Sequence, residues 1–342
     1  MHPHSEPRPK GAVVRRSVSQ KLLDWYRKGH RDLPWRRTSD PYRIWVSEIM
    51  LQQTRAQAVI PYYKRFLERF PTVEALAASA EEDVLALWSG LGYYSRARNL
   101  RRAAQKIATR SGFPRTYDDL RELPGIGDYT AAAIASIAFQ KPHAVMDGNV
   151  LRVVARVEND ASDIGSARTR SRFRDVVDRW LDTRNPGLFN QALMELGATT
   201  CIPRQPLCSR CPLASCCRAR QAGTAAQLPV RLRRVEPVRL AGVLLIVRRG
   251  GKILLRQRAA EERRMAGFWD LPSPEDLPSA RTQRQLGEIR HTITHHHYTL
   301  QVMEASAGRP GSLRHTWFEP ARMKEIPLST TARKGLKLAG VL

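Results

Sequence analysis

All five cysteines of this 342-residue chain lie in one stretch of seventeen residues, 201–217, and the other 325 residues contain none. Disulfide scaffolds instead spread their cysteines through small secreted chains. Four cysteines have the spacing Cys201-x6-Cys208-x2-Cys211-x5-Cys217, and Cys216 is the fifth. A set of four thiolates suits zinc or an iron–sulfur cluster. The cysteines therefore indicate a single metal centre held by one loop.

The spacing also bears on which metal is bound. Zinc sites usually take their ligands from paired C-x2-C knuckles on two separate loops. Here one loop supplies every candidate ligand and contains one C-x2-C pair. We therefore predict a [4Fe–4S] cluster, with zinc or no metal as the alternatives.

The chain is strongly basic, with 57 Lys and Arg against 32 Asp and Glu and a formal charge of +25. Such a surface attracts polyanions, either nucleic acid or an anionic membrane. The longest uncharged apolar runs, 131–139 and 240–247, are too short to span a bilayer, and the first residues do not resemble a signal peptide. We expect a nucleic-acid partner, no membrane and a reducing, cytoplasmic environment.

Composition and periodicity divide the chain into four parts. We expect a disordered basic tail over 1–14, a helical domain over 15–220, a linker over 221–238 and a smaller α+β domain over 239–342. Ser17 is the expected cap of the first helix. Apolar spacing and Pro or Gly punctuation predict further helices over 43–53, 55–69, 81–88, 95–109, 117–122, 128–139, 149–158, 168–182 and 187–196.

The last part has a different pattern. Residues 240–247 and 252–256 flank an Arg-Arg-Gly-Gly sequence, which predicts a hairpin. Strands are also predicted over 291–303 and 315–318, and a final helix over 330–338.

A buried carboxylate is predicted within WVSEIMLQQT, residues 45–54. On a helix, Glu48 shares a face with Ile44 and Leu51, where the pattern calls for an apolar residue. Burial disfavours the charged form and raises the pKa of the carboxyl, which suits a general acid. A Glu at the edge of the apolar stripe is the alternative.

A second carboxylate, Asp147, precedes a predicted helix for which Asn149 is the expected N-cap. The positive end of a helix favours ionised Asp147. Two carboxyl groups with separated pKa values can divide the roles of proton donor and anion, as glycoside cleavage requires. An ordinary turn residue is the alternative.

A third motif is LPGIGDYTA, residues 123–131. Gly125 and Gly127 lie at a turn that opens a helix, where exposed backbone N–H groups can bind a phosphate. A lone G-x-G is a weak signal, but this one lies between helices and about twenty residues before Asp147.

Together these motifs resemble the helix-hairpin-helix DNA glycosylases, and within them the adenine DNA glycosylase (MutY) family, over about residues 17–217. The resemblance implies an all-α helix-hairpin-helix domain whose iron–sulfur loop uses Cys201, Cys208, Cys211 and Cys217. Endonuclease III relatives carry a Lys where this chain has Tyr129, and they lack an acid at the Glu48 position. The resemblance therefore implies base removal without efficient lyase chemistry.

The family's roles transfer to particular residues of this chain. Glu48 is expected to protonate N7 of adenine, and Asp147 to stabilise the oxocarbenium ion. Tyr129 and Asn149 are expected to support these carboxylates by hydrogen bonds. The other positions that match the family's adenine pocket or DNA contacts are Arg36, Gln53, Leu91, Tyr93, Gly125, Gly127 and Gln191. Phosphate contact is expected for a basic run that follows Tyr93, namely Arg96, Arg98, Arg101 and Arg102.

The C-terminal part resembles more loosely the Nudix-type domain of this family, through GFWDLP at 267–272. The chain has no R-E-x-x-E-E run to hold magnesium, so we expect recognition of 8-oxoguanine without pyrophosphatase activity. Thr294 and His295 stand where the family has the last two residues of an F-S-H motif. Nearby histidines also raise a second metal site as a minor alternative.

The resemblance thus implies a monofunctional DNA glycosylase of base excision repair. We expect a monomer, in the bacterial cytoplasm near the nucleoid, that acts on double-stranded DNA with 8-oxoguanine·A or G·A pairs. One alternative is a related glycosylase that removes mismatched thymine or oxidised pyrimidines. The other is a non-catalytic iron–sulfur protein that binds DNA.

Overall fold

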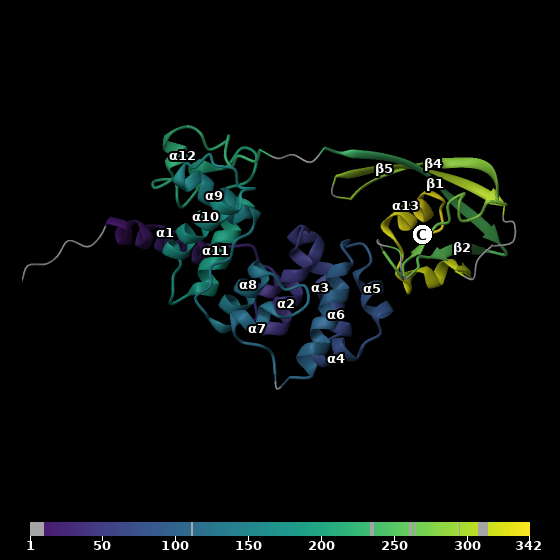
Figure 1. Cartoon of the computed structure of the whole chain (residues 1–342), viewed down its shortest axis with the longest axis horizontal. Coiled ribbons are helices and arrows are strands. Elements are labelled where there is room, and N and C mark those ends of the chain that lie inside the picture. Colours follow the sequence, from purple (N-terminus) through teal and green to yellow (C-terminus); the bar gives the residue numbers. More distant parts are fainter. Residues whose placement is uncertain are drawn as a thin grey trace, which may run out of the picture. The chain divides into compact units, whose positions relative to one another are not determined.

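The computed structural model (Figure 1) describes residues 10–110, 112–232, 236–259, 262, 265–293, 295–306 and 314–342. The chain forms two compact units. The first comprises Met1–Tyr63 and Lys106–Arg234, and the second comprises Lys64–Gln105 and Val235–Leu342. The second unit therefore combines a helical segment with the C-terminal part of the chain.

The described part of the first unit consists of helices and loops. Two helices, α3 and α6, each run across a boundary between the units. The elements that belong to this unit, wholly or in part, are α1 (Lys10–Lys28), η1 (Pro34–Arg36), α2 (Pro41–Leu51), α3 (Ala56–Arg69), α6 (Ser95–Ala108), α7 (Tyr117–Arg121), α8 (Asp128–Phe139), α9 (Gly148–Glu158), α10 (Ala167–Trp180), α11 (Pro186–Thr199), η2 (Cys208–Arg210) and α12 (Arg218–Gln221).

The predicted helices of this unit are present, with small differences at their ends. One prediction was wrong: α1 begins at Lys10, so Ser17 lies inside the helix and does not cap it. Helix α8 packs between α2 and α11 and is buried from Thr130 to Ile137. Its small alanine side chains let both neighbours approach closely, which brings residues from three helices together.

The second unit contains α4 (Val73–Ala78), α5 (Glu81–Trp88) and a six-stranded sheet of order β3-β2-β1-β5-β4, with β6 paired to β2. Strands β1 and β5 are parallel, and the other pairs are antiparallel. The remaining elements are β1 (Val238–Arg249), β2 (Lys252–Gln257), β3 (Trp269–Asp270), β4 (Arg281–Ile293), β5 (His296–Ser306), β6 (His315–Phe318), η3 (Pro320–Lys324) and α13 (Thr330–Leu338).

The predicted hairpin is confirmed, because Arg249 pairs with Lys252 across Gly250 and Gly251. These glycines have φ of +52° and +76°, a left-handed conformation that favours glycine in a two-residue turn. Helix α13 covers one face of the sheet, where Leu336 packs with the apolar side chains of β1 and β5.

The single strand predicted over 291–303 was wrong. The segment turns after β4, and Ile293 pairs with His296 at the start of β5. Apolar and polar residues alternate in β4 and in β5 alike, and no Gly or Pro lies at the turn between them. The periodicity of the sequence therefore could not locate the turn. Thr294 lies outside the described residues.

The connection from β3 to β4, residues 271–280, contains turns and no helix. In the part of the chain that the structure describes, no helix is long and apolar enough to cross a membrane.

Candidate active site and metal centre

Glu48 lies in the interior of the first unit, on α2. Asp40 caps this helix by accepting a 2.8 Å hydrogen bond from the backbone N–H of Tyr42. The Glu48 side chain is only 4% exposed, as its position on the apolar face predicts. Burial raises the pKa of Glu48 to about 7, against the opposing effect of a hydrogen bond from Tyr129. A carboxyl with this pKa is partly protonated at neutral pH.

Tyr129 comes from the first turn of α8. Its hydroxyl donates a 2.8 Å hydrogen bond to Oε2 of Glu48 and lies 3.1 Å from Sδ of Met194. Burial raises the pKa of Tyr129 well above 10, and the nearby carboxylates add to the shift. The phenol therefore remains a donor at neutral pH.

Asp147 is the N-cap of α9, where Asn149 was expected, so this prediction was wrong. Asp147 Oδ1 accepts a 2.7 Å bond from the backbone N–H of Val150, and Oδ2 accepts a 2.9 Å bond from the Asn149 side-chain amide. The N-cap lies two residues earlier than predicted, because α9 starts at Gly148. Asp147 therefore accepts a hydrogen bond through each of its carboxyl oxygens.

The placement of Asn149 depends on a glycine of α11. A Cβ built on Gly197 would lie 2.7 Å from Cβ of Asn149, which is closer than such atoms approach. Arg152 also donates 2.8 Å bonds to Oδ1 of Asn149, to the carbonyl of Gly197 and, through Nε, to the carbonyl of Cys201. Asp147, Asn149, Arg152 and the cysteine loop are thus joined by successive hydrogen bonds.

Glu195 is a site residue that the sequence analysis missed. It is 2% exposed and receives 2.7 Å bonds from the guanidinium groups of Arg31 and Arg36. Burial alone would raise the pKa of Glu195, but the two arginines lower it to about 2. The sequence pattern could have predicted a buried Glu195, because this acidic residue interrupts the apolar face of α11 between Leu193 and Leu196.

Gln191 lies one helical turn before Glu195 on the same helix. The Tyr26 hydroxyl donates a 3.2 Å bond to Oε1 of Gln191, and the Arg36 guanidinium lies 5.4 Å from the centre of the Tyr26 ring. Arg36 and Gln191 therefore belong to one group of contacts, as their predicted shared role requires.

The predicted DNA-contacting residues of the first unit lie in loops. Gln53 is exposed just after α2, with φ of +57°. Gly125 has φ of +79° in the turn before α8, and Gly127 is the N-cap of that helix.

The other predicted DNA contacts belong to the second unit. Tyr93 is 39% exposed and has φ of +50°, whereas Leu91 is 8% exposed. His295 is partly buried in the turn between β4 and β5. His291 lies on β4 while His296 and His297 lie on β5, so the histidines do not form one alternating row.

The expectation that Arg96, Arg98 and Arg101 face phosphates was wrong. Arg96 is 9% exposed and donates to backbone carbonyls of the preceding loop. Arg98 pairs with Glu81 and also donates to the carbonyl of Ala266, and Arg101 donates to the carbonyl of Ser79. Of the four, Arg102 is exposed.

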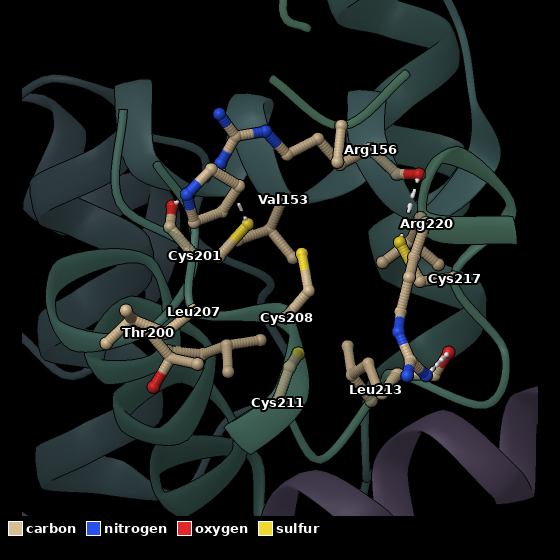
Figure 2. Close-up of a pocket in the computed structure, with 15 residues that line it drawn as sticks. Val153, Arg156, Thr200, Cys201, Leu207, Cys208, Cys211, Leu213, Cys217 and Arg220 are labelled. Carbon is tan, nitrogen blue, oxygen red and sulfur yellow. Dashed lines mark hydrogen bonds between the residues drawn. The ribbon is translucent and has the colours of Figure 1, made fainter. Parts of the chain in front are cut away.

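Four of the five cysteines turn toward one cavity beside α9 (Figure 2), and they are Cys201, Cys208, Cys211 and Cys217. Cys216 does not line this cavity, and its thiol donates to the carbonyl of Leu213. Burial raises the pKa of Cys211 to about 12, and the other three thiols add to the effect. A bound metal ion deprotonates the thiols that coordinate it.

Arg156 joins α9 to the cysteine loop. It is 1% exposed and donates a 3.3 Å bond to Sγ of Cys201 (Figure 2). It also donates to the carbonyls of Ile202, Pro203 and Leu228 at 2.7 to 2.9 Å. One buried side chain therefore joins the start of the cysteine loop, residues 201–203, to Leu228.

Comparisons with known proteins agree with this geometry. Residues 46–179 match the model of the HhH-GPD superfamily base excision DNA repair proteins, and residues 242–338 match that of the NUDIX domain. The rat protein named adenine DNA glycosylase is 34% identical over 92% of this chain and 76% of its own length. The chain belongs to the adenine DNA glycosylase family. This is a family of hydrolases that act on DNA.

Other adenine DNA glycosylases and one solved structure extend the comparison. The human protein is 36% identical over 82% of this chain, and the chain spans 65% of the human protein's length. A thermostable thymine-DNA glycosylase has 27% sequence identity and a TM-score of 0.55, covering 61% of this chain and 98% of that one. This structure shares the helical fold.

The four thiols that line the cavity of this adenine DNA glycosylase family member are a donor set that suits zinc or an iron–sulfur cluster. In the described residues, no group of three or more His, Cys, Asp or Glu could hold one metal ion. The four thiols surround a shared space (Figure 2).

Proposed function

We propose that this protein is a monofunctional DNA glycosylase that hydrolyses the N-glycosidic bond of adenine paired with 8-oxoguanine or guanine. The buried Glu48, held by Tyr129 and with a pKa near 7, is the observation that carries the proposal. Adenine is a poor leaving group as an anion. A general acid with a pKa near the working pH can protonate the base as the bond breaks.

Asp147 supplies the complementary negative charge. We propose that it acts as the anion: it accepts two hydrogen bonds and lies at the N-terminus of α9. An anion beside the sugar stabilises the positive charge that develops on the ring in an oxocarbenium-like transition state. The two carboxyl groups therefore divide the roles of acid and anion.

The hairpin residue favours base removal over strand cleavage. A lyase step requires an amine that attacks the sugar. Tyr129 occupies the hairpin position in this chain, and its high pKa keeps the hydroxyl protonated. We therefore expect hydrolysis by water and little cleavage of the abasic product.

The adenine pocket is proposed to lie at Arg36 and Gln191. Glu195 and the carbonyl of Arg31 fix the guanidinium of Arg36, and Tyr26 orients the amide of Gln191. A guanidinium donor and an amide that can donate and accept suit the ring nitrogens and the amino group of adenine. The base must leave the duplex to reach these groups.

The [4Fe–4S] cluster is proposed to bind Cys201, Cys208, Cys211 and Cys217. Bound there, it would cross-link the loop. Arg156 would direct N–H groups to Cys201 and hold the loop against α9. The catalytic groups belong to α2, α8 and α9, so the protein's own side chains carry the chemistry.

The proposal extends to the domains and the cell. We propose a glycosylase domain over 15–220 and an 8-oxoguanine recognition domain over 239–342, which contain the two matched regions. Thr294 and His295 would contact 8-oxoguanine, while Gln53, Tyr93, Gly125 and Gly127 would contact the duplex. We propose a monomer in a reducing bacterial cytoplasm.

One assay separates this function from its rivals. Protein is incubated with a duplex that holds one 8-oxoguanine·A pair, and alkali then cleaves any abasic site. A break at the adenine supports the proposal. A break instead at thymine in a matched G·T duplex would point to the activity named for the similar thymine-DNA glycosylase. Binding without any break would indicate a non-catalytic protein.

A further inference from the structure

The loop 89–94, between α5 and α6, has an unusual backbone. Gly90, Gly92 and Tyr93 have φ of +106°, +72° and +50°. Glycine adopts these angles readily, but for tyrosine the left-handed region is disfavoured by contacts of its Cβ. Other groups must therefore hold Tyr93 in this conformation.

Arg96 makes the contacts that could do so. Its Nη2 donates to the carbonyls of Leu91 and Gly92 at 3.3 and 3.0 Å, and its Nε donates to the carbonyl of Tyr93 at 3.4 Å. The planar guanidinium thus binds three successive carbonyls of the loop. An ammonium group, a compact charge on a flexible stem, does not reproduce this fork.

Two aromatic rings complete the arrangement. The guanidinium carbon of Arg96 lies 5.5 Å from the ring centres of Trp88 and Tyr93. The Trp88 indole N–H donates a further 3.2 Å bond to the carbonyl of Gly92. Burial of the guanidinium lowers the pKa of Arg96 to about 10, so it remains charged at neutral pH. One ring of the pair, Tyr93, is 39% exposed.

We propose that Arg96 is a positioning residue, which holds the loop 89–94 so that the exposed ring of Tyr93 enters the DNA stack in one fixed orientation. This inference rests on the proposed function, in which Tyr93 contacts the duplex beside the base opposite adenine. Extrusion of a paired base costs free energy, and a pre-ordered wedge lowers that cost. Arg96 would therefore matter most where the target base is well stacked.

The test compares two duplexes under single-turnover conditions. In one, adenine faces 8-oxoguanine; in the other, it faces an abasic analogue, so it is already poorly stacked. Arg96→Met should lower the excision rate at least about tenfold on the first duplex and less than about threefold on the second. Arg96→Lys should behave like Arg96→Met, because it retains the charge without the fork. Equal losses on both duplexes, or wild-type rates for Arg96→Lys, would overturn the inference.

Arg101→Met is the matched control. Arg101 lies on the same helix and donates a 2.7 Å bond to the carbonyl of Ser79, away from the loop. Its removal should leave the ratio of the two excision rates at the wild-type value. A changed ratio would show that any lost arginine of α6 has this effect, which would count against a specific role for Arg96.

A second readout does not depend on excision. With 2-aminopurine beside the 8-oxoguanine, insertion of Tyr93 should unstack the fluorescent base and increase its emission on binding. Arg96→Met should reduce that increase by more than half at saturating protein, with an unchanged melting temperature showing that the fold is intact. If Arg96→Met does not fold, the fluorescence increase is measured on Arg96→Lys instead. A wild-type protein that excises no adenine would overturn the proposed function, and an undiminished fluorescence increase in the variants would overturn the role of Arg96.

Discussion

The Tyr129 hydroxyl donates a 2.8 Å hydrogen bond to Oε2 of Glu48, and this bond joins two helices across 81 residues of sequence. Burial raises the pKa of Glu48, and the bond from Tyr129 opposes the rise. The pair therefore sets the fraction of Glu48 that is protonated near neutral pH. Each member of the pair can be changed separately.

Tyr129→Phe should move the pH dependence of excision to higher pH. A general acid acts in its protonated form, so the rate falls as pH rises through its pKa. Loss of the Tyr129 bond removes an effect that lowers the pKa of Glu48, so the alkaline limb should shift upward. Single-turnover rates across a pH series measure this. Tyr117→Phe, which removes a tyrosine bond to Asp128, should leave the limb in place. An unmoved or lowered limb in Tyr129→Phe would contradict the assignment.

Glu48→Gln should abolish most excision while DNA binding remains. Loss of a general acid typically costs about 10² to 10⁴ in rate. A filter or anisotropy assay reports binding on the same duplex. Full activity of this variant would refute the role of Glu48 as the acid.

The stability of the same variant relative to wild type should increase as pH rises through neutrality. The pKa of Glu48 rises from 4.5 to about 7 on folding, so the folded state binds more protons between these values. Stability from this group is complete below pH 4.5 and is lost as pH rises through 7. Glutamine does not ionise. The free energy of unfolding of Glu48→Gln, taken relative to that of the wild type, should therefore be roughly 3 kcal/mol higher at pH 8 than at pH 4. Denaturant unfolding at the two pH values tests the sign.

Glu195→Gln should destabilise the protein and weaken adenine recognition. It leaves the largely buried guanidinium of Arg36 and the partly exposed one of Arg31 without a carboxylate, and breaking a buried pair costs about 3 kcal/mol or more. Because the pKa of Glu195 falls to about 2 on folding, its contribution is present above pH 4.5 and is lost as pH falls through 2. The difference from wild type should therefore shrink in acid. Unfolding curves at several pH values measure this difference in stability. The control is the exposed pair of Asp32 and Arg37, for which Asp32→Asn should have little effect.

Cys217→Ser and Cys216→Ser should differ in iron content. Cys217 lines the cavity with the three other predicted ligands, whereas Cys216 donates to the carbonyl of Leu213. The first variant should lose most of its iron and its visible absorbance, and the second should retain both. Zinc in place of iron in the purified wild type would refute the cluster itself.

Local patterns in the sequence predicted much of the fold. Helices α5, α8 and α13 begin and end where apolar spacing, Pro and Gly place them. Glu48 was predicted to be buried because it interrupts an apolar stripe, and it is buried. Such features depend on residues a few positions apart, so they can be read without the tertiary structure. The turn between β4 and β5 has no comparable local signal and was missed.

By itself, the sequence determined the helical and α+β parts, the grouping of the cysteines and the candidate carboxylates Glu48 and Asp147, because each depends on residue type and short spacing. Only the tertiary structure decided which partners these groups have. In the tertiary structure, Glu195 binds Arg36, and Asp147 is the N-cap of α9 in place of Asn149. Arg96 donates to the carbonyls of the loop 89–94 and does not face solvent. Hydrogen bonding and burial depend on segments that meet only after folding, and spacing along the chain does not contain that information.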